Sequence, residues 1–194
     1  RGAAMQAAVP VGDGAMAALM GLDVPRVAAL LATLDGVVDI ANDNADGQVV
    51  VSGERAAVEA AVEAARAAGA RRATVLSVSA PFHCRLMRPA AERMAQALGE
   101  VRLATPTVPV VANVTAEPLT EVDAIRAALI DQVCGRVRWR ETMAALTADG
   151  VDRVVEAGAG KVLAGLAKRG VRGAAVLNLE TADDVARVAA ALAD

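Results

Sequence analysis

Residues 37–52, VVDIANDNADGQVVVS, organise the first half of the chain. Residues 37–41 are largely apolar and β-branched, and residues 48–52 are again rich in valine. Between them, residues 42–47 combine Asn, Asp and Gly, which are the residue types that favour tight turns. The stretch therefore predicts two strands that face each other across a turn.

A strand and a helix are expected on each side of this hairpin. On its amino-terminal side, residues 14–22 form a short apolar run, and residues 24–34 place Val and Leu at the i, i+3, i+4, i+7 spacing of a helix. On its carboxyl-terminal side, residues 55–68 form an alanine-rich helix pattern closed by a glycine, and residues 73–78 predict a further strand. The order β-α-β-β-α-β over residues 11–81 is that of a ferredoxin-like unit.

Strands and helices alternate through the second half of the chain. We expect helices over residues 85–98, 121–133, 137–148, 161–168 and 181–194, and strands over residues 107–114, 151–156 and 174–179. Such alternation implies a parallel sheet that is covered by helices on both faces. The predicted fold class is therefore α/β.

Composition excludes several kinds of partner. The 194 residues carry 20 Lys and Arg against 23 Asp and Glu, with one Phe, one Trp and no Tyr. Because nucleic-acid binding draws on cationic surface and often on stacked aromatic rings, this composition argues against it. No apolar run approaches the ~20 residues of a membrane span, and the first residues lack a signal-peptide pattern. We expect a cytoplasmic globular protein that binds neither nucleic acid nor membranes.

His83 is the only histidine, so any imidazole base must be this residue. It lies in SAPFHC, residues 79–84, where the predicted smaller unit gives way to the larger one, and ligand sites are common at such junctions. The alternative is a structural histidine whose ring is satisfied by backbone groups at the start of a helix. No metal site is expected, because Cys84 is adjacent to the histidine and only Cys134 could add another soft ligand. Both cysteines are expected to be reduced thiols, and Cys84 is expected to have a packing role.

Other catalytic motifs are incomplete. The turn AGAGK, residues 157–161, follows a predicted strand, but Leu163 and Val155 occupy positions where dinucleotide and P-loop motifs require glycine. None of the three serines lies in a GxSxG elbow, so the sequence offers no hydrolase nucleophile.

Seven stretches resemble a single family. They are RGAAMQAAVP (residues 1–10), GAMAA (14–18), NDNADGQVVV (42–51), APFH (80–83), PTVPVVANV (106–114), residues 132–139, and EAGAGKVLAG (156–165). Taken together and in this order, they are similar to the malonyl-CoA:acyl-carrier-protein transacylases. In that family an α/β-hydrolase-like subdomain carries an inserted ferredoxin-like subdomain. The resemblance thus implies that residues 1–10 and 82–194 belong to the larger subdomain, of which the sheet is partial here, and residues 11–81 to the smaller one.

The resemblance implies an activity in fatty acid synthesis. A malonyl group would pass from malonyl-CoA to the phosphopantetheine thiol of acyl carrier protein by a ping-pong reaction through a serine ester, with no bound cofactor. The family's GHSxGE elbow lies upstream of the position that matches Arg1, and the chain begins without Met. We therefore expect the C-terminal portion of a longer enzyme, inactive by itself and monomeric when complete.

The family's site residues carry over where positions match. His83 matches the general base and acid, and Gln132 matches a position whose oxygen orients the imidazole. Arg1 matches the arginine that holds the malonyl carboxylate, for which a guanidinium offers two parallel donors. Phe82 matches a bulky position linked to malonyl rather than methylmalonyl selection, and a packing role for it is equally open. Further candidate substrate-binding residues are Met5, Asn42, Asn44 and Asn113.

Two other functions remain open. A β-α-β-β-α-β unit can also be a non-catalytic module for binding small molecules or for dimerisation. The acyltransferase domain of a polyketide synthase would share the same motifs, although the end of the chain directly after the predicted helix over residues 181–194 favours a stand-alone enzyme. A cleft beside His83 lined by Phe82, Gln132 and Arg1 would favour the enzyme, whereas a pocket confined to residues 11–81 would favour the module.

Overall fold

The computed structural model describes residues 1–193, and contacts divide the chain into two compact units, Arg1–Trp139 and Arg140–Asp194. Helices and strands occur in both units, so the predicted α/β class is confirmed. The predicted subdomain boundaries, with residues 11–81 inserted between residues 1–10 and 82–194, stay a prediction.

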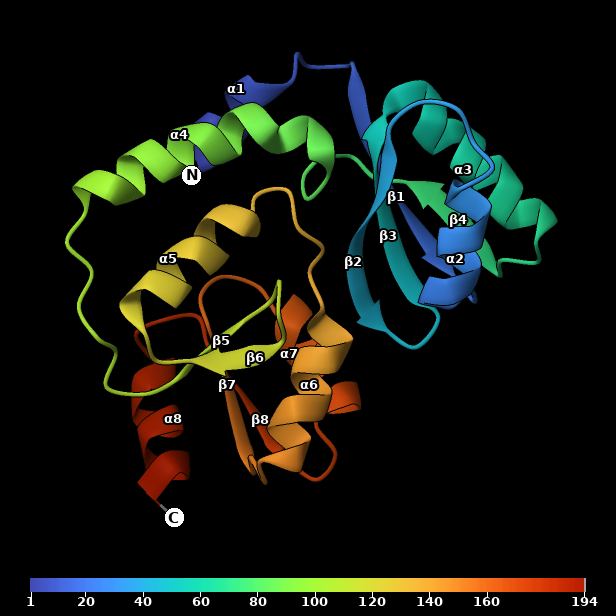
Figure 1. Ribbon diagram of the computed structural model, residues 1–194. Coiled ribbons are helices and arrows are strands. Elements are labelled where there is room, and N and C mark those ends of the chain that lie inside the picture. The colour runs from blue at the N-terminus through green and yellow to red at the C-terminus, as the bar shows by residue number, and fades with distance from the viewer. Residues whose placement is uncertain (194) are drawn as a thin grey trace. The chain divides into compact units, whose positions relative to one another are not determined.

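A four-stranded antiparallel sheet lies in the first unit (Figure 1). In spatial order its strands are β2 (Val38–Ala45), β3 (Gln48–Glu54), β1 (Gly14–Met20) and β4 (Arg72–Val75). The helices between the strands are α2 (Val24–Leu31) and α3 (Arg55–Ala67). The element order is the predicted β-α-β-β-α-β.

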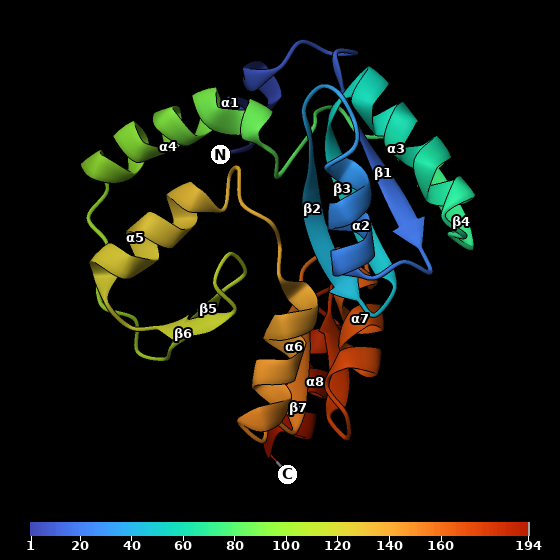
Figure 2. The same ribbon diagram turned by 45° about the vertical axis from the view of Figure 1, so that its right-hand side comes forward.

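Strand β1 is apolar on both faces, and each face packs against a different part of the unit. Ala17 and Leu19 lie in the main core cluster together with residues of α2 and α3, and Figures 1 and 2 show both helices on that side of the sheet. Met16 points to the opposite face, where it forms a cluster with Ala41 against which Phe82 packs. Through Phe82, the segment that follows β4 packs on the second face of the sheet.

Strand β2 is longer than predicted. The pattern assigned residues 42–47 to a turn, whereas β2 continues to Ala45 and only residues 46–47 form the turn. Two register shifts accommodate the polar residues in the strand. The backbone of Asp43 also donates to the carbonyl of Val137 at 2.9 Å, and Val137 donates to Ala41 at 2.8 Å. This pairing with a distant segment keeps the polar half of β2 extended.

Helices and a short hairpin make up the rest of the first unit. They are α1 (Gly2–Ala8), the 3₁₀ helix η1 (Arg85–Met87), α4 (Arg88–Glu100), β5 (Val110–Ala112), β6 (Glu117–Leu119) and α5 (Val122–Asp131). Helix α4 lies between α1 and α5, as both views show (Figures 1 and 2), and Met5, Met87 and Val133 join these elements in one buried cluster. The helix predicted over residues 85–98 starts as a 3₁₀ turn, and Pro89 lies in the first turn of α4, where no N–H is required.

The second unit contains one pair of parallel strands. Strand β7 (Arg153–Ala157) pairs with β8 (Ala175–Leu179), accompanied by α6 (Trp139–Ala148), α7 (Val162–Gly170) and α8 (Asp184–Ala193). Within residues 1–193, this pair represents the parallel sheet that was expected for the second half. The placement of residues 107–114 in that sheet is wrong, because β5 pairs antiparallel with β6. The connection between them is too short for the crossover that a parallel pair needs.

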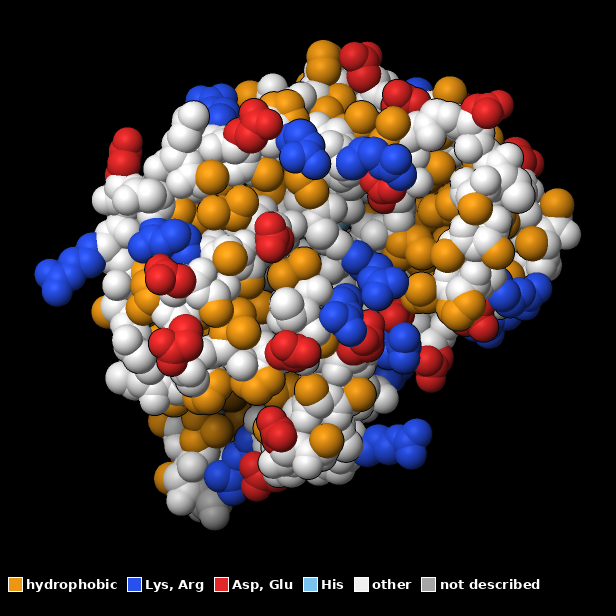
Figure 3. Space-filling view, in the orientation of Figure 1, with side chains coloured by type: hydrophobic (Ala, Val, Ile, Leu, Met, Phe, Trp, Pro, Cys, Tyr) orange, Lys and Arg blue, Asp and Glu red, His pale blue; other side chains and the backbone are white. Residues whose placement is uncertain are grey.

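Charges are mixed on the face of the molecule shown in Figure 3. Acidic and basic side chains are interspersed on the face shown in Figure 3, in keeping with a formal net charge of −3. None of the helices in residues 1–193 combines the length and the hydropathy of a membrane span.

Candidate active site

His83 lies in a strained turn between Pro81 and η1. Its φ is 61°, in the left-handed region that few residues with a side chain adopt. Such a conformation persists where the surroundings hold it. On one side the thiol of Cys84 donates to the carbonyl of Pro81 at 3.1 Å, and on the other the backbone N–H of Arg85 donates to Oδ2 of Asp39 at 2.9 Å. The backbone of His83 is therefore fixed from both directions.

The imidazole is oriented by a backbone carbonyl. Nδ1 of His83 lies 3.0 Å from the carbonyl oxygen of Gln132. Since a carbonyl oxygen only accepts hydrogen bonds, Nδ1 carries the proton in this contact. In the neutral ring, Nε2 is then left with a free lone pair, which is the state that a general base requires.

The electrostatic surroundings keep the ring neutral. Burial lowers the pKa of His83, and the positive charge of Arg1 lowers it further. Hydrogen bonding to the carbonyls of Gln132 and Gly135 acts in the opposite direction, but the net pKa lies below the ordinary 6.5. The neutral imidazole therefore predominates at pH 7.

The turn after α5 supplies both carbonyls. Nε2 of Gln132 donates to the carbonyl of Gly135 at 3.0 Å, and the N–H of Gly135 donates to the carbonyl of Asp131 at 2.7 Å. A Cβ at Gly135 would lie 2.7 Å from Cγ2 of Val114 and 2.8 Å from the Asp131 oxygen, so only glycine fits without displacement. Oε1 of Gln132 is buried and finds no hydrogen-bond partner among the described residues.

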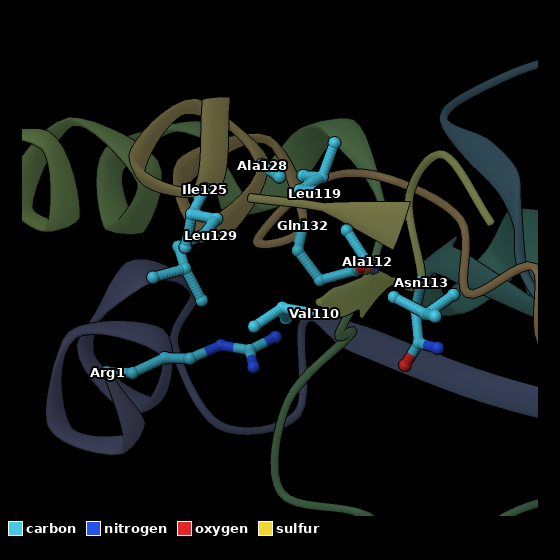
Figure 4. Close-up of a pocket in the computed structure, with 10 residues that line it drawn as sticks. Arg1, Val110, Ala112, Asn113, Leu119, Ile125, Ala128, Leu129 and Gln132 are labelled. Atoms are coloured by element: carbon cyan, nitrogen blue, oxygen red, sulfur yellow. The ribbon is translucent and has the colours of Figure 1, made fainter. Parts of the chain in front are cut away.

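A cavity of about 210 Å³ opens beside this turn (Figure 4). Its polar lining residues are Arg1, Asn113 and Gln132, and its apolar ones are Val110, Val111, Ala112, Leu119, Ile125, Ala128 and Leu129. In Figure 4 the side chain of Arg1 extends from the start of α1 toward Val110. A small apolar cavity with one guanidinium suits a short acyl group that ends in a carboxylate.

The structure brings together four of the residues predicted for the site. Arg1, Gln132 and Asn113 line one cavity, and His83 is joined to it through the carbonyl of Gln132.

The other predicted residues lie outside the lining of that cavity. Met5 is buried in α1, and Phe82 packs against the cluster that contains Met5. Asn42 and Asn44 lie on β2. The predicted roles of these four residues in substrate binding stay predictions.

Sequence reasoning missed two residues that hold the site. The role of Asp39 could not be predicted, because a single carboxylate in a predicted strand is most simply interpreted as a solvent-exposed side chain. Gly135 could have been noticed, since a glycine shortly after the end of a predicted helix favours a tight turn. In the part of the chain that the structure describes, no group of three or more His, Cys, Asp or Glu side chains could hold a metal ion.

Comparison with known proteins shows the family. Residues 1–191 match the family described as "Acyl transferase domain", so the chain belongs to that family.

Particular relatives are more specific. The malonyl CoA-acyl carrier protein transacylase of Escherichia coli (strain K12) is 48% identical over 171 residues, which cover 87% of this chain and 55% of the relative. The crystal structure of the acyl-carrier-protein-S-malonyltransferase from Bartonella henselae matches with a TM-score of 0.94 and 48% identity, over 100% of this chain and 62% of that one.

A second similar structure is that of a type II PKS acyl-carrier protein in complex with its malonyl-transacylase. It matches with a TM-score of 0.89 and 40% identity, over 100% of this chain and 62% of that one. The resemblance found in the sequence is confirmed, and the chain spans about half the length of the curated relatives it matches.

Proposed function

We propose that this chain carries the general base and the carboxylate anchor of an enzyme that transfers malonyl from malonyl-CoA to acyl carrier protein. The observation that carries the proposal is the contact between Nδ1 of His83 and the carbonyl of Gln132, which leaves Nε2 as a base. The relatives are named as malonyl transferases, and Arg1 lies at the cavity beside this contact. The nucleophile is proposed to be a serine outside these 194 residues.

In the first half-reaction, Nε2 of His83 takes the proton of the serine hydroxyl while the serine oxygen attacks the malonyl thioester. The imidazolium then returns this proton to the departing thiolate of coenzyme A, which leaves a malonyl ester on the serine. In the second half-reaction Nε2 takes the proton of the phosphopantetheine thiol, and the thiol sulfur attacks the ester. The proton then passes to the departing serine oxygen.

The cavity accounts for the choice of acyl group. The guanidinium of Arg1 would pair with the free carboxylate of malonyl, a contact that acetyl does not offer. Asn113 would add a polar contact at the same cavity. We also propose that four further residues lie near the substrate, namely Phe82, Met5, Asn42 and Asn44. The bulk of Phe82 would limit the binding of α-branched acyl groups.

The architecture and the partners complete the proposal. Residues 11–81 would be a ferredoxin-like subdomain, supported by the strand order β2-β3-β1-β4 with both helices on one face. Residues 1–10 and 82–194 would belong to an α/β-hydrolase-like subdomain. The complete enzyme would be a cytoplasmic monomer with malonyl-CoA and acyl carrier protein as partners and without a bound cofactor, nucleic acid or membrane.

The test is a malonyl-transfer assay of the enzyme that contains both the serine elbow and this chain. Changing His83 to Ala should lower kcat by at least about 100-fold, because general base catalysis typically contributes 10²–10⁴. Changing the exposed Lys168 to Ala provides the matched control. An unchanged rate in the His83 variant would contradict the proposal, and transfer by the 194 residues alone would contradict the external serine. Carrier proteins from fatty acid and from type II polyketide synthesis, assayed in parallel, distinguish the two acceptors.

A further inference from the structure

Strand β2 anchors both of the segments that meet at the imidazole. Asp39, near its start, binds Arg85, which is two residues after His83. Further along the strand, the backbone at Ala41 and Asp43 pairs with Val137, in the segment that continues from Gln132. The donor and the acceptor of the His83–Gln132 contact are thus both tied to one strand.

The contact between Asp39 and Arg85 has two separable parts. The backbone N–H of Arg85 donates to Oδ2 at 2.9 Å. The guanidinium adds Nε to Oδ1 at 3.1 Å and to Oδ2 at 3.0 Å, and Nη2 to Oδ1 at 2.5 Å. Both oxygens of one carboxylate are therefore used, and the backbone bond does not depend on the side chain of Arg85.

Asp39 is suited to hold a backbone group. Its side chain is 25% exposed, against 64% for Arg85. Burial raises the pKa of Asp39, but the hydrogen bonds and the charge of Arg85 outweigh burial, so that the net pKa lies below the ordinary value. Arg136 lines the same surface groove as these two residues. The carboxylate is ionised at pH 7, and a charged acceptor binds an N–H more strongly than a neutral one.

We propose that Asp39 is a positioning residue for His83, acting through the backbone N–H of Arg85 to hold the left-handed turn that aims the imidazole at the carbonyl of Gln132. As a role in transfer, this rests on the proposed function. The backbone of His83 is strained, and strain of this kind relaxes when a neighbouring restraint is removed. Without the bond to Arg85, φ of His83 is expected to relax to a negative value, which would turn the ring away from Gln132.

The single histidine gives a direct measurement on the chain itself. With ¹⁵N-labelled protein, NMR reports which nitrogen of the neutral ring carries the proton, with no overlap from other histidines. The contact with Gln132 predicts the Nδ1–H tautomer in the unchanged chain. Circular dichroism and a cooperative thermal transition show that each variant is folded.

Two variants remove the backbone restraint by different routes. Asp39→Thr suits a strand but is too short to reach the N–H of Arg85. Arg85→Pro deletes that N–H and leaves Asp39 in place. Proline fits there because Arg85 opens the 3₁₀ helix and the preceding Cys84 is extended, with φ −133° and ψ 170°. We expect the ratio of Nδ1–H to Nε2–H to fall roughly tenfold in both, about the factor that one lost hydrogen bond corresponds to.

Three controls separate positioning from general damage. Arg85→Ala keeps the backbone N–H, and Asp39→Asn keeps an acceptor for it, so both should change the tautomer ratio by less than about threefold. Asp184→Ala removes a comparable aspartate, which accepts from Arg187 and from the backbone of Thr181 in the other unit, and should leave the ratio unchanged.

The outcomes separate this inference from the proposed function. An unchanged tautomer ratio in a folded Asp39→Thr or Arg85→Pro chain overturns the inference, even if His83 proves essential for transfer. If Arg85→Ala lowers the ratio as much as Arg85→Pro, the guanidinium and not the backbone bond is responsible, and the inference as stated is wrong. A lowered ratio in both restraint variants supports it, even where transfer proves independent of His83.

Discussion

Replacing Gly135 with Ala should destabilise the first unit and disturb His83 at the same time. The φ of Gly135 is not positive, so the cost comes from space alone. The added Cβ would lie 2.7 Å from Cγ2 of Val114 and 2.8 Å from the carbonyl oxygen of Asp131. Neither atom moves easily, because valine is stiff at χ1 and the oxygen belongs to the end of α5.

Forcing one extra methyl group into such a site typically costs about 1–3 kcal/mol. For a chain of this length each kcal/mol lowers Tm by roughly 2–4 °C, so a decrease of about 2–12 °C is expected by differential scanning calorimetry. The carbonyl of Gly135 also contributes to the environment of His83. The NMR signals of the imidazole should therefore move in the same variant.

Gly99→Ala is the matched control in the same unit. Gly99 lies in α4, and a Cβ there meets nothing within 4 Å. Because alanine is the better helix former, this variant should be up to about 1 kcal/mol more stable than the original chain. A Gly135→Ala chain that melts at or above the original temperature would refute the close packing of this turn, and unmoved His83 signals would refute its link to the imidazole.

Three further predictions concern the electrostatics of His83 and the stability of the second unit. Malonate should raise the pKa of His83 in an NMR titration, since it would neutralise the charge of Arg1. Arg1→Ala should raise this pKa by itself and abolish the effect of malonate. A malonate effect on the pKa that survives in the Arg1→Ala variant contradicts this prediction. Because the pKa of His83 is lowered on folding, the unfolded chain binds more protons below pH 6.5. The free energy of unfolding, measured in urea, should therefore fall as the pH drops from 7 to 5. His83→Gln should flatten this dependence on pH. The carboxylate of Glu156 caps the start of α7, because it accepts from the backbone N–H groups of Leu163 at 3.1 Å and Ala164 at 2.7 Å. Glu156→Ala should therefore lower the free energy of unfolding of the second unit by about 1–2 kcal/mol in urea. An unchanged urea midpoint would refute this capping role.

Residue patterns within a single segment predicted the strands and helices that depend on that segment alone. The strand at residues 14–20 follows from an apolar run, and the helix at residues 55–67 follows from an alanine-rich pattern closed by a glycine. Both were predicted to within two residues at each end. The continuation of β2 to Ala45 could not be predicted in this way, because it depends on a backbone pairing with Val137. The hairpin of β5 and β6 was missed because three-residue strands carry too little pattern to show their direction.

The site was predictable to a similar degree. The chain's single histidine and the family resemblance made His83 and Gln132 candidates, but did not show which oxygen of Gln132 contacts the imidazole. The backbone carbonyl accepts from the imidazole, while the side-chain amide holds Gly135. The side chain of Gln132 thus acts one step from the ring. Sequence gives the residue type, whereas this division of roles depends on how the turn after α5 closes.

An imidazole held by carbonyl oxygens differs from one held by a carboxylate. A carboxylate would stabilise the imidazolium with a full negative charge, whereas the carbonyl dipoles of Gln132 and Gly135 orient the ring with a weaker field. Burial and the charge of Arg1 outweigh that field, so the proton on Nε2 is held loosely. In the proposed reaction the same nitrogen accepts and returns a proton in each half-reaction, and a loosely held proton favours its return. The left-handed backbone conformation of His83 brings Nδ1 to the carbonyl of Gln132. The ring is thus oriented by a neutral carbonyl and not by an anion, which keeps the pKa of the imidazole low enough for the proton to be returned.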